Sequence, residues 1–258
     1  SRIRRTDWRG FIFSRSDSSD IMSAPIHVLH VEDNPEFASM TETWVERHSE
    51  AIRISREASP NDALDRLDGH QPDCIVSDYQ MPGMTGIELL SAVRESHPDL
   101  PFILFTSESV EDVADDALEA GVTDYLQKDT GTEQYGLLAN RIEHAVERRR
   151  AKTDYRQLLE ATPTPVVVVD PDGGTVVDTN DPFADLVGEP REELLDASLI
   201  DLLDDSAGDG IEAGVQAVAD GDSRTEEWAF GGADSRRVEL NPAEMGGRTR
   251  VVGFVGSA

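Results

Sequence analysis

Short apolar runs alternate with longer segments, in which apolar residues recur every three or four positions, from Ile26 to about Arg150. The apolar runs predict five strands, at residues 26–31, 52–55, 74–77, 102–105 and 124–127. The segments between them predict helices, one opened by Ser59-Pro60 and one ended by Gly121. The helix before Gly121 is expected to turn one apolar face inward, made of Val110, Val113, Ala117 and Leu118. This alternation predicts a doubly wound, five-stranded parallel sheet with helices on both faces.

After Arg150 the pattern changes to that of an antiparallel sheet. One helix, over residues 137–160, continues past the fifth unit and ends before Pro163. Further elements are predicted as strands at 166–169, 175–177, 224–230, 236–240 and 250–255, with a helix near 211–219. We therefore predict a disordered extension over residues 1–22, a first domain over 23–150 and a smaller α+β domain over 151–258. The basic stretch 148–150 interrupts the heptad pattern, so a coiled coil in the connecting helix stays an open alternative.

The extension, residues 1–22, is rich in Arg and Ser and has no clear period. It lacks the apolar segment of about 7–15 residues that a signal peptide needs. We expect natural translation to start at Met22, and a basic tether is the alternative interpretation.

The chain of 258 residues carries 23 basic and 52 acidic side chains, a net charge of −29. The excess is spread evenly, with 10 basic against 26 acidic groups in residues 23–150 and 8 against 23 in residues 151–258. Such a charge argues against nucleic acid and anionic membranes as partners. Only Lys128 and Lys152 are lysines, and the acidic surface resembles that of proteins from salt-in halophiles, haloarchaea above all. Disorder is the alternative, but 38% hydrophobic residues in periodic blocks argue against it.

The cysteine count and the length of the apolar runs limit the class of protein further. The single Cys74 excludes a disulfide within the chain and a cysteine zinc cluster. No apolar run approaches the roughly 18 residues of a membrane span. These features predict a soluble, cytoplasmic protein.

Acidic, hydroxyl and basic side chains directly follow the predicted strands of the first domain. The first strand leads into Glu32-Asp33, the third into Asp78, the fourth into Thr106 and the fifth into Lys128. Because the carboxyl ends of parallel strands meet at one edge of the sheet, these side chains are expected to converge. Three carboxylates there would suit Mg²⁺, and a lysine with a hydroxyl would supply donors for a phosphoryl group. A carboxylate can itself be the nucleophile and form an acyl phosphate.

Residues 25–150 resemble the receiver domain of two-component response regulators, which has a flavodoxin-like fold. Four blocks at the family's spacing carry the resemblance: HVLHVEDN at 27–34, IVSDYQMPGMTG at 75–86, LFTS at 104–107 and DYLQK at 124–128. The resemblance implies that Asp78 accepts a phosphoryl group from a sensor histidine kinase. It implies a set of supporting roles: Mg²⁺ held by Glu32, Asp33, Asp78 and the backbone carbonyl of Gln80, the phosphoryl oxygens bound by Lys128 and Thr106, and Tyr125 as the switch aromatic. It also implies no enzyme activity beyond slow Mg²⁺-dependent self-phosphorylation and self-dephosphorylation.

One position departs from the family pattern, because Asp129 follows Lys128 where a cis proline is usual. A cis bond before a residue other than proline costs about 3–4 kcal/mol, so we expect a trans bond or an altered turn. The haloacid-dehalogenase-type phosphatases are an alternative class that uses a strand-end aspartate. They need a second aspartate two residues later, where this chain has Gln80.

Residues 155–258 resemble a PAS sensor domain through TNDPFADLVG at 179–188 and ELL at 193–195. All histidines lie at or before His144 and Cys74 lies in the first domain, which excludes a haem ligand and a flavin–cysteinyl adduct in the second. A small-molecule site, a dimer contact and a purely structural domain all stay open. His144 precedes Ala145 rather than the acid of a histidine-kinase box, so we interpret it as a solvated helix residue.

We therefore predict a response regulator that is phosphorylated on Asp78 and passes its signal through a PAS domain. Homodimerisation through the fifth receiver helix or the PAS domain is a further expectation, and a nucleic-acid partner is not expected. The alternative is a non-phosphorylated receiver scaffold in which the PAS domain is a small-molecule sensor or a dimerisation module.

Overall fold

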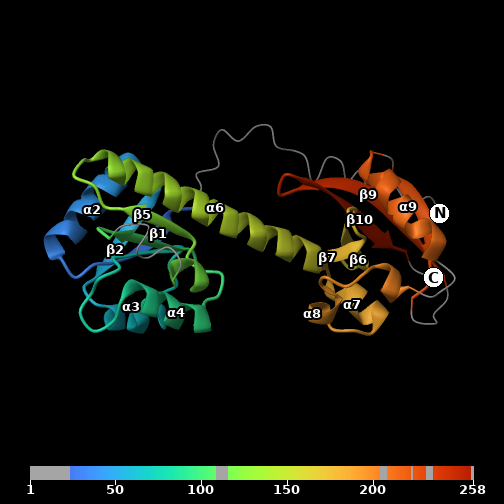
Figure 1. The fold of residues 1–258 in the computed structure, drawn as a ribbon, viewed down its shortest axis with the longest axis horizontal. Helices are drawn as coiled ribbons and strands as arrows, with labels where there is room; N and C mark the ends of the chain where they lie inside the picture. The colour runs from blue at the N-terminus through green and yellow to red at the C-terminus, as the bar shows by residue number, and fades with distance from the viewer. Residues whose placement is uncertain (1–23, 109–115, 204–207, 222, 231–234, 257–258) are drawn as a thin grey trace. The chain divides into compact units, whose positions relative to one another are not determined.

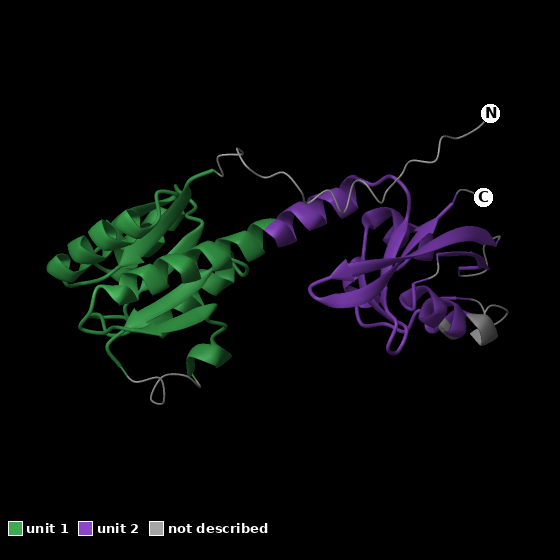
Figure 2. Ribbon diagram, turned by 90° about the horizontal axis from the view of Figure 1, so that it is seen from above, with its two compact units in different colours: residues 1–150 green, residues 151–258 purple. Residues whose placement is uncertain are grey.

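The computed structural model describes residues 24–108, 116–203, 208–221, 223–230 and 235–256. It divides into two compact units, Ser1–Arg150 and Ala151–Ala258 (Figure 2). Among the helices within these described ranges, none combines the length and apolar character that crossing a bilayer requires.

A parallel five-stranded sheet forms the centre of the first unit (Figure 1). Its strands are β1 (Ile26–Val31), β2 (Ile52–Glu57), β3 (Cys74–Ser77), β4 (Phe102–Thr106) and β5 (Asp124–Gln127). Their order, β2-β1-β3-β4-β5, confirms the predicted flavodoxin-like sheet. β3 is buried along its whole length, as expected for a central strand covered by helices on both faces.

Helices cover both faces of this sheet. They are α2 (Pro35–His48), α3 (Pro60–Leu67), α4 (Gly86–Ser96) and α6 (Glu133–Ala161). α2 and α6 share one apolar core with the sheet, whereas α3 and α4 share the other. The sequence pattern predicts this first helix only from Phe37 to His48. α2 begins two residues earlier because the side chain of Asn34 accepts hydrogen bonds from the first free N–H groups of the helix.

The predicted helix between β4 and β5 lies in part outside the described residues, including Val110 and Val113. Residues 116–119 are helical, and Gly121 follows with a φ of 78°, as predicted for a left-handed helix end. Ala117 is buried, but the prediction that Leu118 shares its inward face is wrong, because Leu118 is 72% exposed. Neighbouring helical residues point about 100° apart, so burying Ala117 turns Leu118 toward solvent.

An antiparallel five-stranded sheet forms the second unit, which confirms the predicted α+β class. Its strands are β6 (Val166–Asp170), β7 (Thr175–Thr179), β8 (Arg224–Trp228), β9 (Arg236–Met245) and β10 (Arg248–Val255), in the order β7-β6-β10-β9-β8. The helical elements are α7 (Asp181–Val187), α8 (Arg191–Leu194), the 3₁₀ turn η1 (Ile200–Leu202) and α9 (Gly208–Ala219). The apolar core lies between these helices and one face of the sheet, with Phe183, Trp228 and Phe230 as its largest members.

β9 is five residues longer than predicted, because it continues past Pro242 to Met245. A proline inside a strand removes a hydrogen-bond donor and is normally confined to edges. Here β8 pairs with β9 only as far as Leu240, so the stretch around Pro242 pairs on one side, with β10. Gly246 and Gly247 then close the hairpin with φ values of 60° and 74°.

Asn180 is fully buried and joins three parts of the second unit. Its side-chain oxygen accepts hydrogen bonds from the N–H groups of Val166 (2.8 Å) and Phe183 (3.2 Å). Its side-chain nitrogen donates to the backbone oxygens of Leu159, Thr162 and Thr164. The end of α6, the start of β6 and the start of α7 are therefore held by one amide.

Candidate functional site

Three carboxylates meet where β1 and β3 end. Glu32 and Asp33 follow β1, and Asp78 follows the adjacent β3. One carboxylate oxygen from each of the three lies within 4.8 Å of the other two. Glu32 and Asp78 are 3% and 8% exposed, whereas Asp33 is exposed at the rim. The predicted convergence of these side chains is therefore present in the fold.

Lys128 provides a positive charge inside this cluster. Its ammonium nitrogen lies 2.7 Å from Oε2 of Glu32 and 3.2 Å from Oδ2 of Asp78, and 12% of the side chain is exposed. The backbone N–H of Lys128 donates to the carbonyl oxygen of Thr106 at 2.7 Å, which ties the residue to the end of β4. One ammonium beside three carboxylates leaves a net charge of −2 when all are ionised. Clustered oxygen ligands with uncompensated negative charge are the donor set that suits a hard divalent cation such as Mg²⁺.

The electrostatics of Glu32 reflect this crowding. Burial raises the pKa of the Glu32 carboxyl, and the charge of Asp78 raises it further. The hydrogen bond and the charge of Lys128 oppose both effects. Any further cation bound among these oxygens would likewise favour the ionised carboxylate.

Thr106 and Tyr125, the predicted phosphoryl ligand and switch aromatic, meet the same short segment. The hydroxyl of Thr106 accepts a hydrogen bond from the backbone N–H of Glu108 at 3.2 Å. The hydroxyl of Tyr125 donates to the backbone oxygen of Glu108 at 2.5 Å. The two hydroxyls are therefore linked through one residue of the loop after β4.

Gln80 lies on the loop that follows Asp78, and Gly86 begins the helix α4 at the end of that loop. Gln80 is exposed there, and its expected role as a carbonyl ligand stays a prediction. A Cβ atom on Gly86 would lie 2.3 Å from the backbone oxygen of Asp78, so the start of α4 approaches the acidic residue too closely for any side chain. Oδ1 of Asp78 also accepts a hydrogen bond from the N–H of Tyr79 at 2.8 Å, which fixes the carboxylate.

The turn after Lys128 is built differently from the family pattern. No described peptide bond is cis, so the Lys128–Asp129 bond has the expected trans geometry. The side-chain amide of Gln134 pairs with both backbone groups of Asp129: it accepts from the N–H at 2.9 Å and donates to the carbonyl oxygen. It also donates to the carbonyl oxygen of Gly131 at 2.8 Å. Sequence reasoning missed Gln134, although the N–H that Asp129 has and proline lacks was a signal that a partner was needed.

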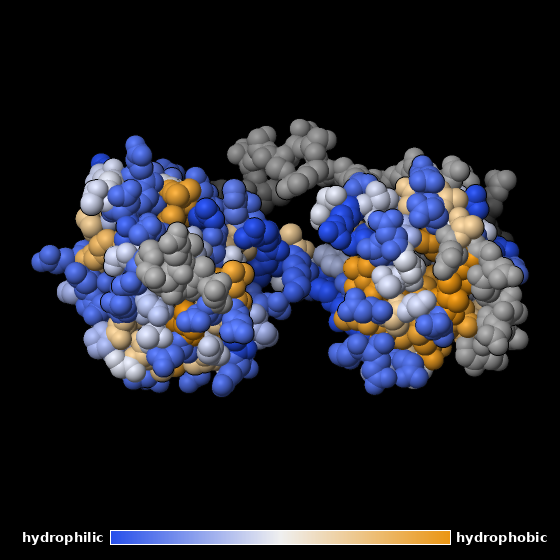
Figure 3. Space-filling model, in the orientation of Figure 1, coloured by the Kyte–Doolittle hydropathy of each residue, from blue (hydrophilic) through white to orange (hydrophobic). Residues whose placement is uncertain are grey.

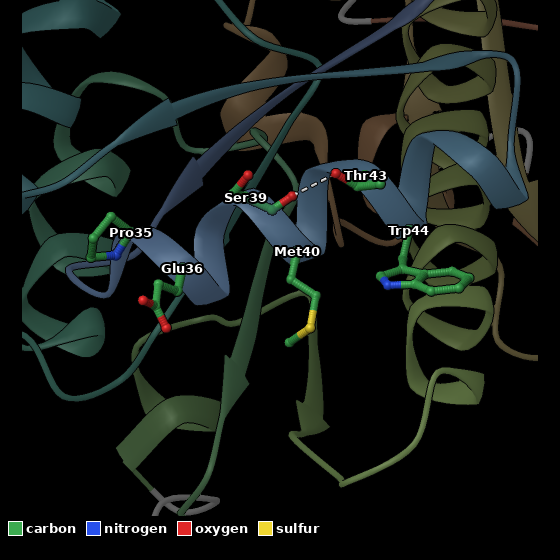
Figure 4. Close-up of a pocket in the computed structure, with 6 residues that line it drawn as sticks. All are labelled: Pro35, Glu36, Ser39, Met40, Thr43 and Trp44. Carbon is green, nitrogen blue, oxygen red and sulfur yellow. Dashed lines mark hydrogen bonds between the residues drawn. The ribbon is translucent and has the colours of Figure 1, made fainter.

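A shallow groove lies on the outer side of α2, apart from the acidic cluster (Figure 4). It is lined by Pro35, Glu36, Ser39, Met40, Thr43 and Trp44. Met40 is 43% exposed, and the guanidinium of Arg47 lies 5.3 Å from the centre of the Trp44 ring. None of the strand-end residues Glu32, Asp33, Asp78, Thr106 and Lys128 lines it, so the groove is not part of the candidate site.

Two family models match the chain. Residues 28–139 match the response regulator receiver domain. Residues 153–256 match the PAS fold. The two matches fall in the two compact units that the structure shows.

The similar proteins include regulatory proteins and a solved chemotaxis response regulator. NtrC of Klebsiella pneumoniae, named a DNA-binding transcriptional regulator, is 32% identical over 131 residues, which are 51% of this chain and 23% of that protein. The luminescence regulatory protein LuxO of Vibrio campbellii is 35% identical over 98 residues, which are 38% of this chain and 21% of that protein. The solved chemotaxis response regulator CheY4 of Vibrio cholerae is 25% identical with a TM-score of 0.43, covering 46% of this chain and 99% of its own.

The chain therefore spans less than a quarter of the length of these two curated relatives. Together the sheet order, the strand-end chemistry and the two family matches lead to one assignment. The chain carries a response regulator receiver domain followed by a PAS domain.

Proposed function

We propose that this receiver domain accepts a phosphoryl group on Asp78 from a sensor histidine kinase and passes the signal on through the PAS domain. The observation that carries the proposal is the position of Asp78, which lies beside both an acidic pair and the ammonium of Lys128. A carboxylate held by a backbone N–H on one oxygen and by a lysine on the other is fixed in one orientation. Such preorganisation favours in-line attack on phosphorus.

In the proposed reaction an oxygen of Asp78 forms a bond to phosphorus while the bond between phosphorus and the kinase histidine nitrogen breaks. The electron pair of that broken bond stays on the imidazole. Glu32, Asp33, Asp78 and the carbonyl of Gln80 would hold Mg²⁺, which would neutralise charge on the phosphoryl oxygens. Lys128 and Thr106 would bind those oxygens by charge and by a hydroxyl donor.

Tyr125 would change its surroundings when Asp78 is phosphorylated. A phosphoryl oxygen that accepts a hydrogen bond from the hydroxyl of Thr106 would draw this hydroxyl toward Asp78 and away from the N–H of Glu108. The same residue accepts the hydrogen bond of Tyr125, so a rearranged Glu108 would change the surroundings of the ring. Glu108 and the Tyr125 ring would therefore form a two-state element, whose conformation responds to the charge of the phosphoryl group.

We further propose a cytoplasmic protein adapted to high salt, as in haloarchaea. The single cysteine, Cys74, is buried and unpaired, in keeping with a reducing compartment. The proposal of salt adaptation rests on the net charge of −29 and on its even spread. A sensory or dimerising role for the PAS domain belongs to the same proposal, as does the absence of enzyme activity beyond slow self-phosphorylation and self-dephosphorylation.

Incubation with acetyl phosphate and Mg²⁺ tests the central step. Intact-protein mass spectrometry is expected to show one added phosphoryl group, which Asp78→Asn abolishes because the amide is no nucleophile. Asp65→Asn is the matched control, since Asp65 is exposed on α3, and it is expected to be phosphorylated like the wild type. Chelation of Mg²⁺ is expected to stop the reaction in the wild type and in Asp65→Asn.

Two outcomes would count against the proposal. A wild-type chain that takes no phosphoryl group under conditions in which it is folded would favour the non-phosphorylated scaffold. A phosphoryl group that persists in Asp78→Asn would place the acceptor elsewhere.

A further inference from the structure

The ammonium of Lys128 has two aromatic neighbours in addition to its two carboxylates. The ammonium nitrogen lies 4.3 Å from the centre of the Phe37 ring and 5.9 Å from that of the Phe105 ring. A cation is attracted to the face of an aromatic ring within about 6 Å, and more strongly when water is excluded. Because only 12% of the Lys128 side chain is exposed, Phe37 meets the conditions for a strong contact of this kind.

The ring of Phe37 is itself held in place. The residue lies in the first turn of α2, where its N–H donates to Oδ1 of Asn34 at 3.2 Å. Its ring packs against Phe105 and Tyr135, with centroids 5.7 Å and 6.5 Å away. The ring therefore forms a fixed wall beside a lysine whose four-carbon side chain is flexible by itself.

The three attractions on Lys128 respond differently to occupation of the site. Glu32 and Asp78 attract the ammonium now, but the same carboxylates would hold a divalent cation, which repels it. The attraction of an aromatic ring needs no carboxylate and remains when their charge is neutralised. The share of Phe37 in holding Lys128 therefore grows once the metal is bound and before the phosphoryl group arrives.

We propose that Phe37 is a positioning residue, whose ring face holds the ammonium of Lys128 within reach of the phosphoryl group on Asp78. This inference rests on the proposed phosphorylation of Asp78 and adds to it a residue outside the strand ends. Phe37 acts through Lys128 and touches neither the metal ligands nor the phosphorus.

The test compares Phe37→Leu with Phe37→Tyr in the full chain. Leucine keeps an apolar side chain in the core and removes the ring face, whereas tyrosine keeps the ring. The initial rate of phosphorylation by acetyl phosphate is expected to fall roughly fivefold in Phe37→Leu and to stay near the wild-type rate in Phe37→Tyr. Thermal unfolding of each variant checks that the domain is folded at the assay temperature.

Repeating Phe37→Leu in a Lys128→Gln background separates positioning from packing. If Phe37 acts through the ammonium, Phe37→Leu lowers the phosphorylation rate no further once Lys128→Gln has removed that ammonium. An unchanged rate in Phe37→Leu, or an equal loss in both backgrounds, would overturn the inference while leaving the proposed function standing. A wild-type chain that is never phosphorylated on Asp78 would overturn the proposed function, and this inference with it.

Discussion

His30 lies in β1 with 1% of its surface exposed, and neither ring nitrogen has a hydrogen-bond partner among the described residues. Burial lowers the pKa of this imidazole to about 3, with smaller contributions from the charges of Lys128 and Arg56. The ring is therefore neutral in the folded chain across the physiological range. In the unfolded chain it takes up a proton below its ordinary pKa of 6.5.

This difference predicts a loss of stability in acid. Between pH 6.5 and about 3 the unfolded chain binds a proton that the folded chain excludes, so the free energy of unfolding falls by about 1.4 kcal/mol per pH unit. Relative to wild type, His30→Leu is expected to gain about 2 kcal/mol between pH 7 and pH 5, measured by urea unfolding at fixed high salt. His70→Leu is the matched control, because His70 is exposed, and it should gain almost nothing. Parallel curves for wild type and His30→Leu would contradict the prediction.

The strand-end residues could be predicted because each directly follows an apolar run. Glu32, Asp78 and Lys128 needed only the rule that parallel strands end at one edge. Phe37 and Gln134 could not be predicted in the same way. Their roles depend on how close a helix lies to the strand end. A local sequence pattern does not predict that distance.

Among the elements, the start of α7 depends most on a single side chain. Asn180→Ala would remove the cap of α7 and take their side-chain partner from the N–H of Val166 and the carbonyl oxygens of Thr162 and Thr164. The carbonyl oxygen of Leu159 would keep its hydrogen bond from the N–H of Thr162. Buried groups that lose a partner cost about 1–3 kcal/mol each, so we expect a loss of at least about 3 kcal/mol. Hydrogen exchange of peptides covering β6 and α7 is expected to become faster.

Asn140→Ala is the matched control for Asn180→Ala, because Asn140 is exposed on α6. Its exchange rates should equal those of the wild type. Unchanged protection of β6 in Asn180→Ala would show that the amide does not hold the three segments together.

Most element bounds could be predicted from hydrophobic period and turn residues. The greater length of β9 has a physical cause, since Pro242 lies beyond Leu240, the last residue of β9 that pairs with β8. Sequence patterning indicates that a proline interrupts a ladder but does not give the length of the neighbouring strand. In the same way, the apolar period before Gly121 could not decide which of Ala117 and Leu118 faces the core.

At the scale of the whole molecule, repulsion between acidic side chains is the main electrostatic effect. In Figure 3 hydrophilic residues cover most of the visible face of the first unit, whereas the second unit also shows large hydrophobic areas. Over the whole chain, 52 acidic groups outnumber 23 basic ones. At roughly 0.1 M salt these charges repel across about 10 Å, whereas at about 1 M the range falls to about 3 Å. We expect the far-UV circular dichroism of the folded chain to weaken at roughly 0.1 M KCl and to recover in several molar KCl.

Urea unfolding at both salt concentrations gives the quantitative measure, with a higher midpoint expected in the concentrated salt. A circular dichroism signal and a urea midpoint that do not change with KCl would refute salt dependence. The assays of phosphoryl transfer therefore belong in high salt, so that loss of fold is not mistaken for loss of chemistry.

The scarcity of lysine has a practical consequence for labelling. The chain has two lysine side chains, of which Lys152 is exposed and Lys128 is nearly enclosed by carboxylates and aromatic rings. Reductive methylation with isotope-labelled formaldehyde would therefore give a spectrum of very few methyl resonances. One of them would come from the centre of the candidate site, and its slow labelling would measure how often that site opens.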